Sequence, residues 1–286
     1  MTAAFRDELR PNIASPCVSV ISRTVNNQGT KLNSSRRRGP GETLIFVHGL
    51  TDDASSFSRV IKALGSYYDI IAYDLRGHGK SDAPGCGYEI ADHASDLLTI
   101  LEVEAIADAT LIGHSLGAEV AMQVARSRPD LIRALVIEDP PWQPDWVGVP
   151  NARRQLATAS WRKWIQHLQA LPLDDVIKIG LEETPHWNVD DIRAWAVAKH
   201  DCRLVALDSV LAIREPYQAA LNDLKCPTLL MTGDTRKGAI VTRSMAVEAH
   251  KLTPQIRVVS IDGAGHGIHR DQFDAFVNAL RDFLRN

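Results

Sequence analysis

The chain has 286 residues, enough for one large α/β domain with an insertion or for two small domains. Its net charge is −3, with 32 Lys and Arg against 35 Asp and Glu, which argues against nucleic acid or an anionic membrane as a partner. No apolar run approaches the roughly 20 residues that span a bilayer, and the N-terminus lacks the apolar stretch of a secretory signal. The sequence therefore favours a cytoplasmic protein, and the scattered cysteines are expected to be free thiols.

Apolar runs alternate with amphipathic stretches along the first half of the chain. A short continuous apolar run such as 43–47 suits a strand buried on both faces of a parallel sheet. The basic run Arg36-Arg37-Arg38 predicts a solvated loop. Strands are expected at 17–24, near 29–34, and at 43–47, 69–73, 109–112 and 134–138, and helices at 55–64, 91–103 and 116–127.

The alternation stops after Asp139-Pro140-Pro141, and the chain up to about residue 222 has a helical pattern. Strand–helix alternation implies parallel strands joined by right-handed crossovers. A helical block inserted after one strand predicts a lid over the carboxyl ends of the strands, where open α/β sheets bind ligands. We therefore expect a core of 1–139 and 223–286 and a helical lid of 140–222. The later core elements are strands 226–232 and 256–261 and helices 240–251 and 271–284.

The strongest chemical signal is Gly113-His114-Ser115-Leu116-Gly117, which lies between a predicted strand and a predicted helix. Glycines two residues before and after Ser115 relieve crowding in a sharp strand-to-helix turn. The turn exposes the hydroxyl at a helix N-terminus, where free N–H groups favour an oxyanion. This context predicts that Ser115 is a nucleophile rather than a helix-capping serine.

Two glycine-containing segments supply the expected partners of Ser115. In Phe46-Val47-His48-Gly49-Leu50 the glycine lets the backbone approach a substrate, so the N–H groups of Leu50 and Leu116 form the predicted oxyanion hole. His266 lies in a glycine-rich loop after the last strand and is the predicted general base. His269 is expected on the following loop or helix start, and a metal site formed with His266 would lack a third ligand, so no metal is predicted.

From about residue 40 to its end the chain resembles the α/β-hydrolase superfamily. The resemblance implies an α/β-hydrolase fold, with a mostly parallel sheet, helices on both faces and a helical lid. It also implies a serine hydrolase that cleaves a small ester, lactone or amide without a cofactor. In lidded members the segment that corresponds to 74–81 shapes a loop, so we assign it no catalytic role. Four segments match in the family's order: 46–49, 74–81, 113–117 and 263–266.

The acid that should orient His266 departs from the family's common position. That position holds Arg236, which cannot accept an imidazole N–H. Asp234 is close, but it occupies a position that usually turns away. A smaller subset of the family places the acid after the strand at 134–138, which gives Asp139. We therefore favour Asp139 and keep Asp234 as the alternative, while a helix-capping role for Asp139 stays open.

The predicted lid is rich in aromatic and arginine side chains. One interpretation is that the tryptophans pack in a core and the arginines lie on solvated faces. The other is that the tryptophans form an apolar substrate pocket in which an arginine binds a carboxylate. The residues concerned are Trp142, Trp146, Arg153, Arg154, Trp161, Arg162 and Trp164.

Three other functions stay open on the same fold. One is carbon–carbon bond hydrolysis, another is a cofactor-free dioxygenase in which a His–Asp pair deprotonates an aromatic substrate, and the third is a non-catalytic small-molecule receptor. The intact Gly-His-Ser-Leu-Gly segment and the complete set of catalytic residue types favour hydrolysis. The expected partner is a small-molecule carbonyl substrate, and the expected state is a monomer or homodimer.

Overall fold

The apolar runs of the sequence pair into one sheet in the computed structural model, which describes residues 20–142, 151–212 and 214–285. Eight strands within these residues pair in the order β1-β2-β4-β3-β5-β6-β7-β8. Residues 17–19, which belong to the first predicted strand, lie outside the described part of the chain. The strands are β1 (Val20–Asn27), β2 (Thr30–Arg37), β3 (Thr43–Val47), β4 (Asp69–Tyr73), β5 (Ala109–His114), β6 (Ile132–Glu138), β7 (Thr228–Thr232) and β8 (Ile256–Ser260).

Parallel pairing brings the carboxyl ends of the central strands to one edge of the sheet. β3 pairs in parallel with β4 and β5, and β5, β6, β7 and β8 continue in parallel, whereas β1 and β2 join antiparallel. The predicted mostly parallel sheet is confirmed. Ser115 directly follows β5 and Asp139 directly follows β6, so both lie at the edge where α/β sheets bind ligands.

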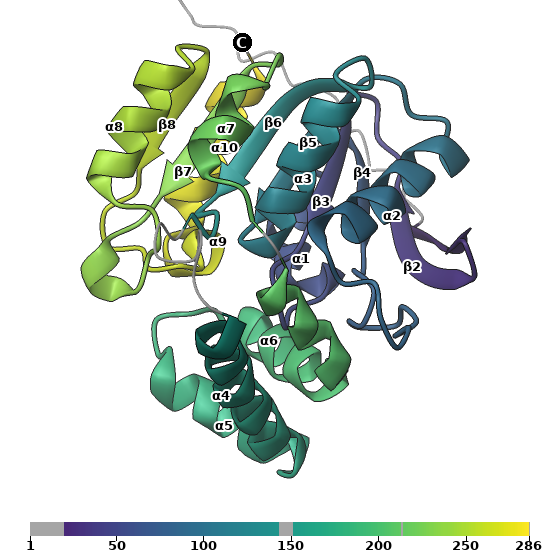
Figure 1. Cartoon of the computed structure of the whole chain (residues 1–286), viewed down its shortest axis with the longest axis vertical. Helices are drawn as coiled ribbons and strands as arrows, with labels where there is room; N and C mark the ends of the chain where they lie inside the picture. The colour runs from purple at the N-terminus through teal and green to yellow at the C-terminus, as the bar shows by residue number, and fades with distance from the viewer. Residues whose placement is uncertain (1–19, 143–150, 213, 286) are drawn as a thin grey trace, which may run out of the picture.

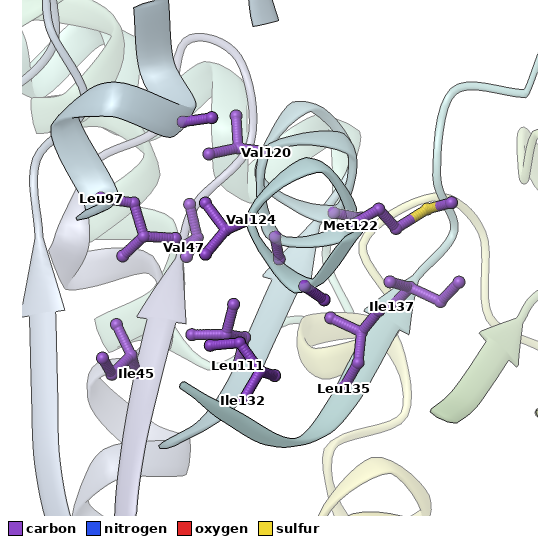
Figure 2. Close-up of a cluster of buried hydrophobic side chains, with 14 of the residues drawn as sticks. Ile45, Val47, Leu97, Leu111, Val120, Met122, Val124, Ile132, Leu135 and Ile137 are labelled. Carbon is purple, nitrogen blue, oxygen red and sulfur yellow. The ribbon is translucent and has the colours of Figure 1, made fainter. Parts of the chain in front are cut away.

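Helices cover both faces of the sheet (Figure 1), as predicted. Those around the sheet are η1 (Ala54–Phe57), α1 (Ser58–Leu64), α2 (Ile90–Val103), α3 (Leu116–Ser127), α7 (Tyr217–Asn222), η4 (Thr235–Lys237), α8 (Arg243–Leu252), α9 (Ile268–Asp271) and α10 (Phe273–Leu284). Because successive strand residues face opposite sides, Ile45 and Val47 pack toward α2 and α3, while Leu44 and Phe46 pack toward α1 and α10. Figure 2 shows the first of these clusters beside α3.

A separate group of helices follows β6 and lies away from the sheet, beyond the carboxyl ends of its strands (Figure 1). It consists of α4 (Asn151–Gln169), α5 (Leu173–Glu183), α6 (Val189–Asp201) and η3 (Leu204–Leu211). Leu168, Val176 and Trp195 form its own apolar cluster, and Asp191 pairs with Arg59 of the core at 2.6 Å. α7 instead packs its apolar residues into the core. None of the helices in the described ranges has the length and hydropathy needed to cross a bilayer.

The expectation of a solvated loop at Arg36-Arg37-Arg38 is wrong for its first two residues, because Arg36 and Arg37 both lie in β2. Arg36 is only 6% exposed. Its guanidinium donates to Asp69 and, at 2.7 Å, to Glu104, so two acids from distant segments compensate its charge. The sequence pattern could not show this, because both acids reach Arg36 only through the folded chain.

We expect the Arg36→Met variant to unfold more easily than the wild type by about 3–5 kcal/mol, since it leaves two buried carboxylates without the buried cation that they share. Urea denaturation measures this difference. The matched control is Arg38→Met, because the Arg38 side chain is 56% exposed and 3.8 Å from Asp69, and its loss should cost about 1 kcal/mol or less. Equal effects of the two substitutions would contradict the structural role given to Arg36.

Candidate active site

Ser115 occupies a strained turn between β5 and α3. Its φ of 52° and ψ of −119° form a conformation that residues other than glycine rarely adopt. Its N–H donates to the carbonyl of Glu138 at 3.0 Å. A Cβ at Gly113 would come within 2.3 Å of the Gly117 carbonyl oxygen, and a Cβ at Gly117 within 2.1 Å of the Val47 carbonyl oxygen. The two glycines are therefore required by the close approach of backbone around Ser115.

The loop that follows β3 is held by a buried histidine from the segment after β4. Nε2 of His78 accepts a hydrogen bond from the N–H of Thr51 at 3.1 Å, while its Nδ1 donates to the carbonyl of Arg76 at 2.9 Å. Burial, together with the nearby His48, lowers the pKa of His78 to about 3, so the ring is neutral near pH 7. This neutral tautomer fixes the backbone next to Leu50.

Asp139 directly follows β6, and its carboxylate meets His266. Oδ2 accepts from Nδ1 of His266 at 2.6 Å and from the N–H of Ile240 at 2.8 Å, while Oδ1 accepts from the N–H of Val241 at 2.9 Å. Asp139 is fully buried and has a φ of 40°. The structure thus brings together the predicted base and the favoured acid.

The alternative acid, Asp234, is engaged by its neighbour. Its carboxylate accepts from the backbone N–H of Arg236 at 2.9 Å and from the Arg236 guanidinium at 2.7 Å. These hydrogen bonds lower the pKa of Asp234 to about 2. In the described structure, Asp234 caps η4 and bonds to Arg236, whereas His266 bonds to Asp139.

A second histidine–carboxylate pair lies next to the first, and the sequence analysis did not find it. Glu138 accepts from the N–H of His269 at 2.9 Å and from its Nδ1 at 2.8 Å, and both residues are buried. Burial raises the pKa of Glu138, but His269 and His114 outweigh that effect and hold it at about 2. His114 also donates through Nε2 to the carbonyl of His266 at 3.0 Å. The described residues contain no group of three His, Cys, Asp or Glu side chains that could share a metal ion.

A cavity of about 720 Å³ opens between the core and the lid beside Ser115. Leu116 is the first residue of α3, so its N–H has no acceptor within the helix. The cavity is lined by Ser115 and His266, by Leu50 and Leu116, and by the lid tryptophans Trp161, Trp164, Trp187 and Trp195.

Of the three lid arginines singled out in the sequence, Arg154 and Arg162 have side chains that the structure describes, and neither lines this cavity. Arg154 donates to the carbonyls of Leu211 and Ala212, and Arg162 pairs with Asp208 at 2.5 Å. Trp142 stacks on Tyr217 and belongs to the core. Trp146 and the side chain of Arg153 lie outside the described residues.

The chain is similar to known proteins over most of its length. A model described as "Alpha/beta hydrolase family" matches residues 44–279. The chain is 28% identical over 276 residues to 2-(acetamidomethylene)succinate hydrolase of Mesorhizobium japonicum, covering 92% of this chain and 95% of that protein. It is also 28% identical over 274 residues to N-formylmaleamate deformylase of Pseudomonas putida, covering 93% of this chain and 97% of that protein.

One solved structure shows the same similarity in three dimensions. The crystal structure of E-2-(acetamidomethylene)succinate hydrolase matches with a TM-score of 0.78 and 26% identity, covering 94% of this chain and all of that one. The position of Asp139 after β6 also makes the sequence resemble the subset of hydrolases that includes this enzyme. The similarity of the whole chain agrees with that resemblance.

Because His78 is neutral in the folded protein, the free energy of unfolding should depend on pH. Because the pKa of His78 is about 3 in the folded protein and near 6.5 when unperturbed, the unfolded chain takes up this proton first, and stability falls as pH drops between these values. His78→Gln can still accept from Thr51 but does not titrate. We expect urea unfolding at several pH values between about 6 and 4 to show a slope shallower by roughly 1.4 kcal/mol per pH unit. An unchanged slope would contradict a neutral His78.

Proposed function

The chain belongs to the α/β-hydrolase family, and on that basis we propose that it is a serine hydrolase that cleaves a small ester, lactone or amide. The observation that carries the proposal is the shared cavity of Ser115 and His266, with Asp139 bonded to the far side of the imidazole. Leu50 and Leu116 line the same cavity. This set contains a nucleophile, a base, an orienting acid and two backbone donors, which acyl transfer to water requires.

In the proposed mechanism, Ser115 attacks the substrate carbonyl while Nε2 of His266 accepts the hydroxyl proton. Nδ1 of His266 donates to Asp139, so the lone pair of the neutral ring lies on Nε2, and the carboxylate stabilises the imidazolium that forms. The N–H groups of Leu50 and Leu116 stabilise the tetrahedral oxyanion. The imidazolium then protonates the leaving group, and a water deprotonated by His266 releases the acyl group from Ser115.

The two curated relatives suggest which bond to test first. One is named for hydrolysis of an acetamido compound and the other for deformylation of an N-formyl compound, so both act on N-acyl substrates. We therefore propose an amide as the first substrate class to assay, followed by esters and lactones.

A fluorophosphonate probe should label the wild-type protein at Ser115, because such probes phosphonylate serines activated by a base. The Ser115→Ala variant should show no labelling and no hydrolysis of a chromogenic short-chain ester. Gel fluorescence and peptide mass spectrometry measure the labelling. Persistent labelling of the variant would exclude Ser115 as the nucleophile, and an unlabelled wild type would favour a receptor of this fold.

The acid is tested by a matched pair of substitutions. Asp139→Asn should lower kcat by roughly 10³–10⁴-fold, because an amide cannot hold His266 in the required tautomer. Asp234→Asn should change kcat by less than about threefold, since Asp234 bonds to Arg236. Steady-state kinetics with the same ester decide the question, and the reverse order of effects would assign the acid to Asp234.

A further inference from the structure

Arg270 is a buried cation on the wall of the catalytic cavity with hydrogen-bond donors to spare. It lies in α9, four residues after His266, and is 5% exposed. Its Nε and Nη2 are buried and have no hydrogen-bond partner among the described residues. A guanidinium carries five N–H donors, and leaving them unsatisfied away from water is costly. Such donors are expected where a ligand supplies the acceptors.

Arg270 belongs to a cluster of charged side chains with Asp52 and Lys199. Oδ2 of Asp52 lies 3.1 Å from Nη1 of Arg270, and Oδ1 accepts from Nζ of Lys199 at 2.8 Å. All three residues are at least 95% buried and line the cavity that contains Ser115. Burial raises the pKa of Asp52, but Arg270 and Lys199 outweigh it and hold that pKa well below its usual range. One carboxylate therefore faces two basic side chains. Burial lowers the pKa of Lys199 and Asp52 opposes that shift; with both basic groups protonated, the cluster carries a net charge of +1.

Other charged groups on the cavity wall have their own partners or lie in solvent. Arg214 donates to both carboxylate oxygens of Glu119 at 2.9 Å. Asp271 accepts from the N–H of Gly265 at 2.6 Å and from Nε1 of Trp187 at 2.5 Å. The Trp187 ring also lies over the Arg270 guanidinium, with Cζ 5.0 Å from the ring centroid. The ring packs against the guanidinium as a cation–π contact, and a carboxylate that binds the buried Nε and Nη2 must shift the side chains that cover them.

We propose that the substrate carries a carboxylate, which the Nε and Nη2 groups of Arg270 bind while Asp52, itself bonded to Lys199, holds the guanidinium in position. This inference rests on the proposed hydrolase function and adds its substrate class. A planar carboxylate matches the guanidinium fork with two parallel hydrogen bonds. The net charge of +1 suits a monoanion, whereas a phosphate monoester would bring a second negative charge close to Asp52.

The test compares two esters of equal acyl length, mono-(4-nitrophenyl) glutarate and 4-nitrophenyl pentanoate. The wild type should have the higher kcat/KM for the glutarate ester. Arg270→Met should reduce that kcat/KM by about 10- to 100-fold, the loss expected for hydrogen bonds to a charged group. The same variant should lose clearly less on the pentanoate ester, because that substrate has no carboxylate for Arg270 to bind. Equal losses on both esters, or no wild-type preference for the glutarate ester, would overturn the proposal.

Two further variants separate the subsite from a general effect on the fold. Arg270→Lys keeps the charge beside Asp52 but lacks the fork, so it should also lose most of the glutarate preference. Arg133→Met removes an exposed arginine that pairs with Asp108 near the other end of β6 and should keep the wild-type preference. A glutarate preference retained by Arg270→Lys would contradict bidentate binding.

Protection from fluorophosphonate labelling tests the subsite without turnover. Glutarate should slow labelling of Ser115 in the wild type and leave the labelling rate of Arg270→Met unchanged, while inorganic phosphate should protect neither. Stronger protection by phosphate would overturn the choice of a carboxylate. Labelling of the wild type without protection by glutarate would contradict the subsite alone, whereas an unlabelled wild type would contradict the proposed hydrolase function.

Discussion

The buried carboxylate of Asp139 holds together three segments that lie far apart in the sequence. Its oxygens accept hydrogen bonds from the N–H groups of Ile240 and Val241, which are 101 and 102 residues further along the chain. They also accept one from Nδ1 of His266, 127 residues further along. Because no solvent reaches Asp139, the protein itself must satisfy its charge, and losing any of these donors would be costly. The loops after β6, β7 and β8 are therefore fixed relative to one another, and the position of the imidazole depends on all three.

Beneath the cavity lies a layer of polar groups that are linked to one another by hydrogen bonds. Glu138 accepts from His269, His114 donates to the carbonyl of His266, and the N–H of Ser115 donates to the carbonyl of Glu138. These contacts link β5, β6 and the start of α9 at the carboxyl edge of the sheet. A strained turn such as that of Ser115 persists only where its surroundings determine it on several sides. The parallel sheet provides those surroundings, since adjacent strands end at the same level.

Two carboxylates of the core connect the lid to the cavity wall. Asp52 pairs with Lys199 of α6, and Asp271 bonds to Trp187 in the segment between α5 and α6. Both acids also contact groups that belong to the proposed site, since Asp52 pairs with Arg270 and Asp271 accepts from the N–H of Gly265. The lid therefore contributes charge as well as apolar surface to the cavity. Lys199 and Arg270 come from lid and core respectively, and they share one acid.

The sequence by itself determined the alternating strands and helices and the parallel sheet. It also determined the glycine-flanked turn of Ser115 and the glycine-rich loop of His266, because each depends on a local pattern or on backbone sterics. Only the tertiary structure decided that Asp139 meets His266 while Asp234 bonds to Arg236. It also decided that Arg36 is buried, and that Glu138 faces His269 from 131 residues away. The role of a charged side chain depends on which partners reach it, and those partners are brought together by strand pairing and lid packing rather than by proximity along the chain.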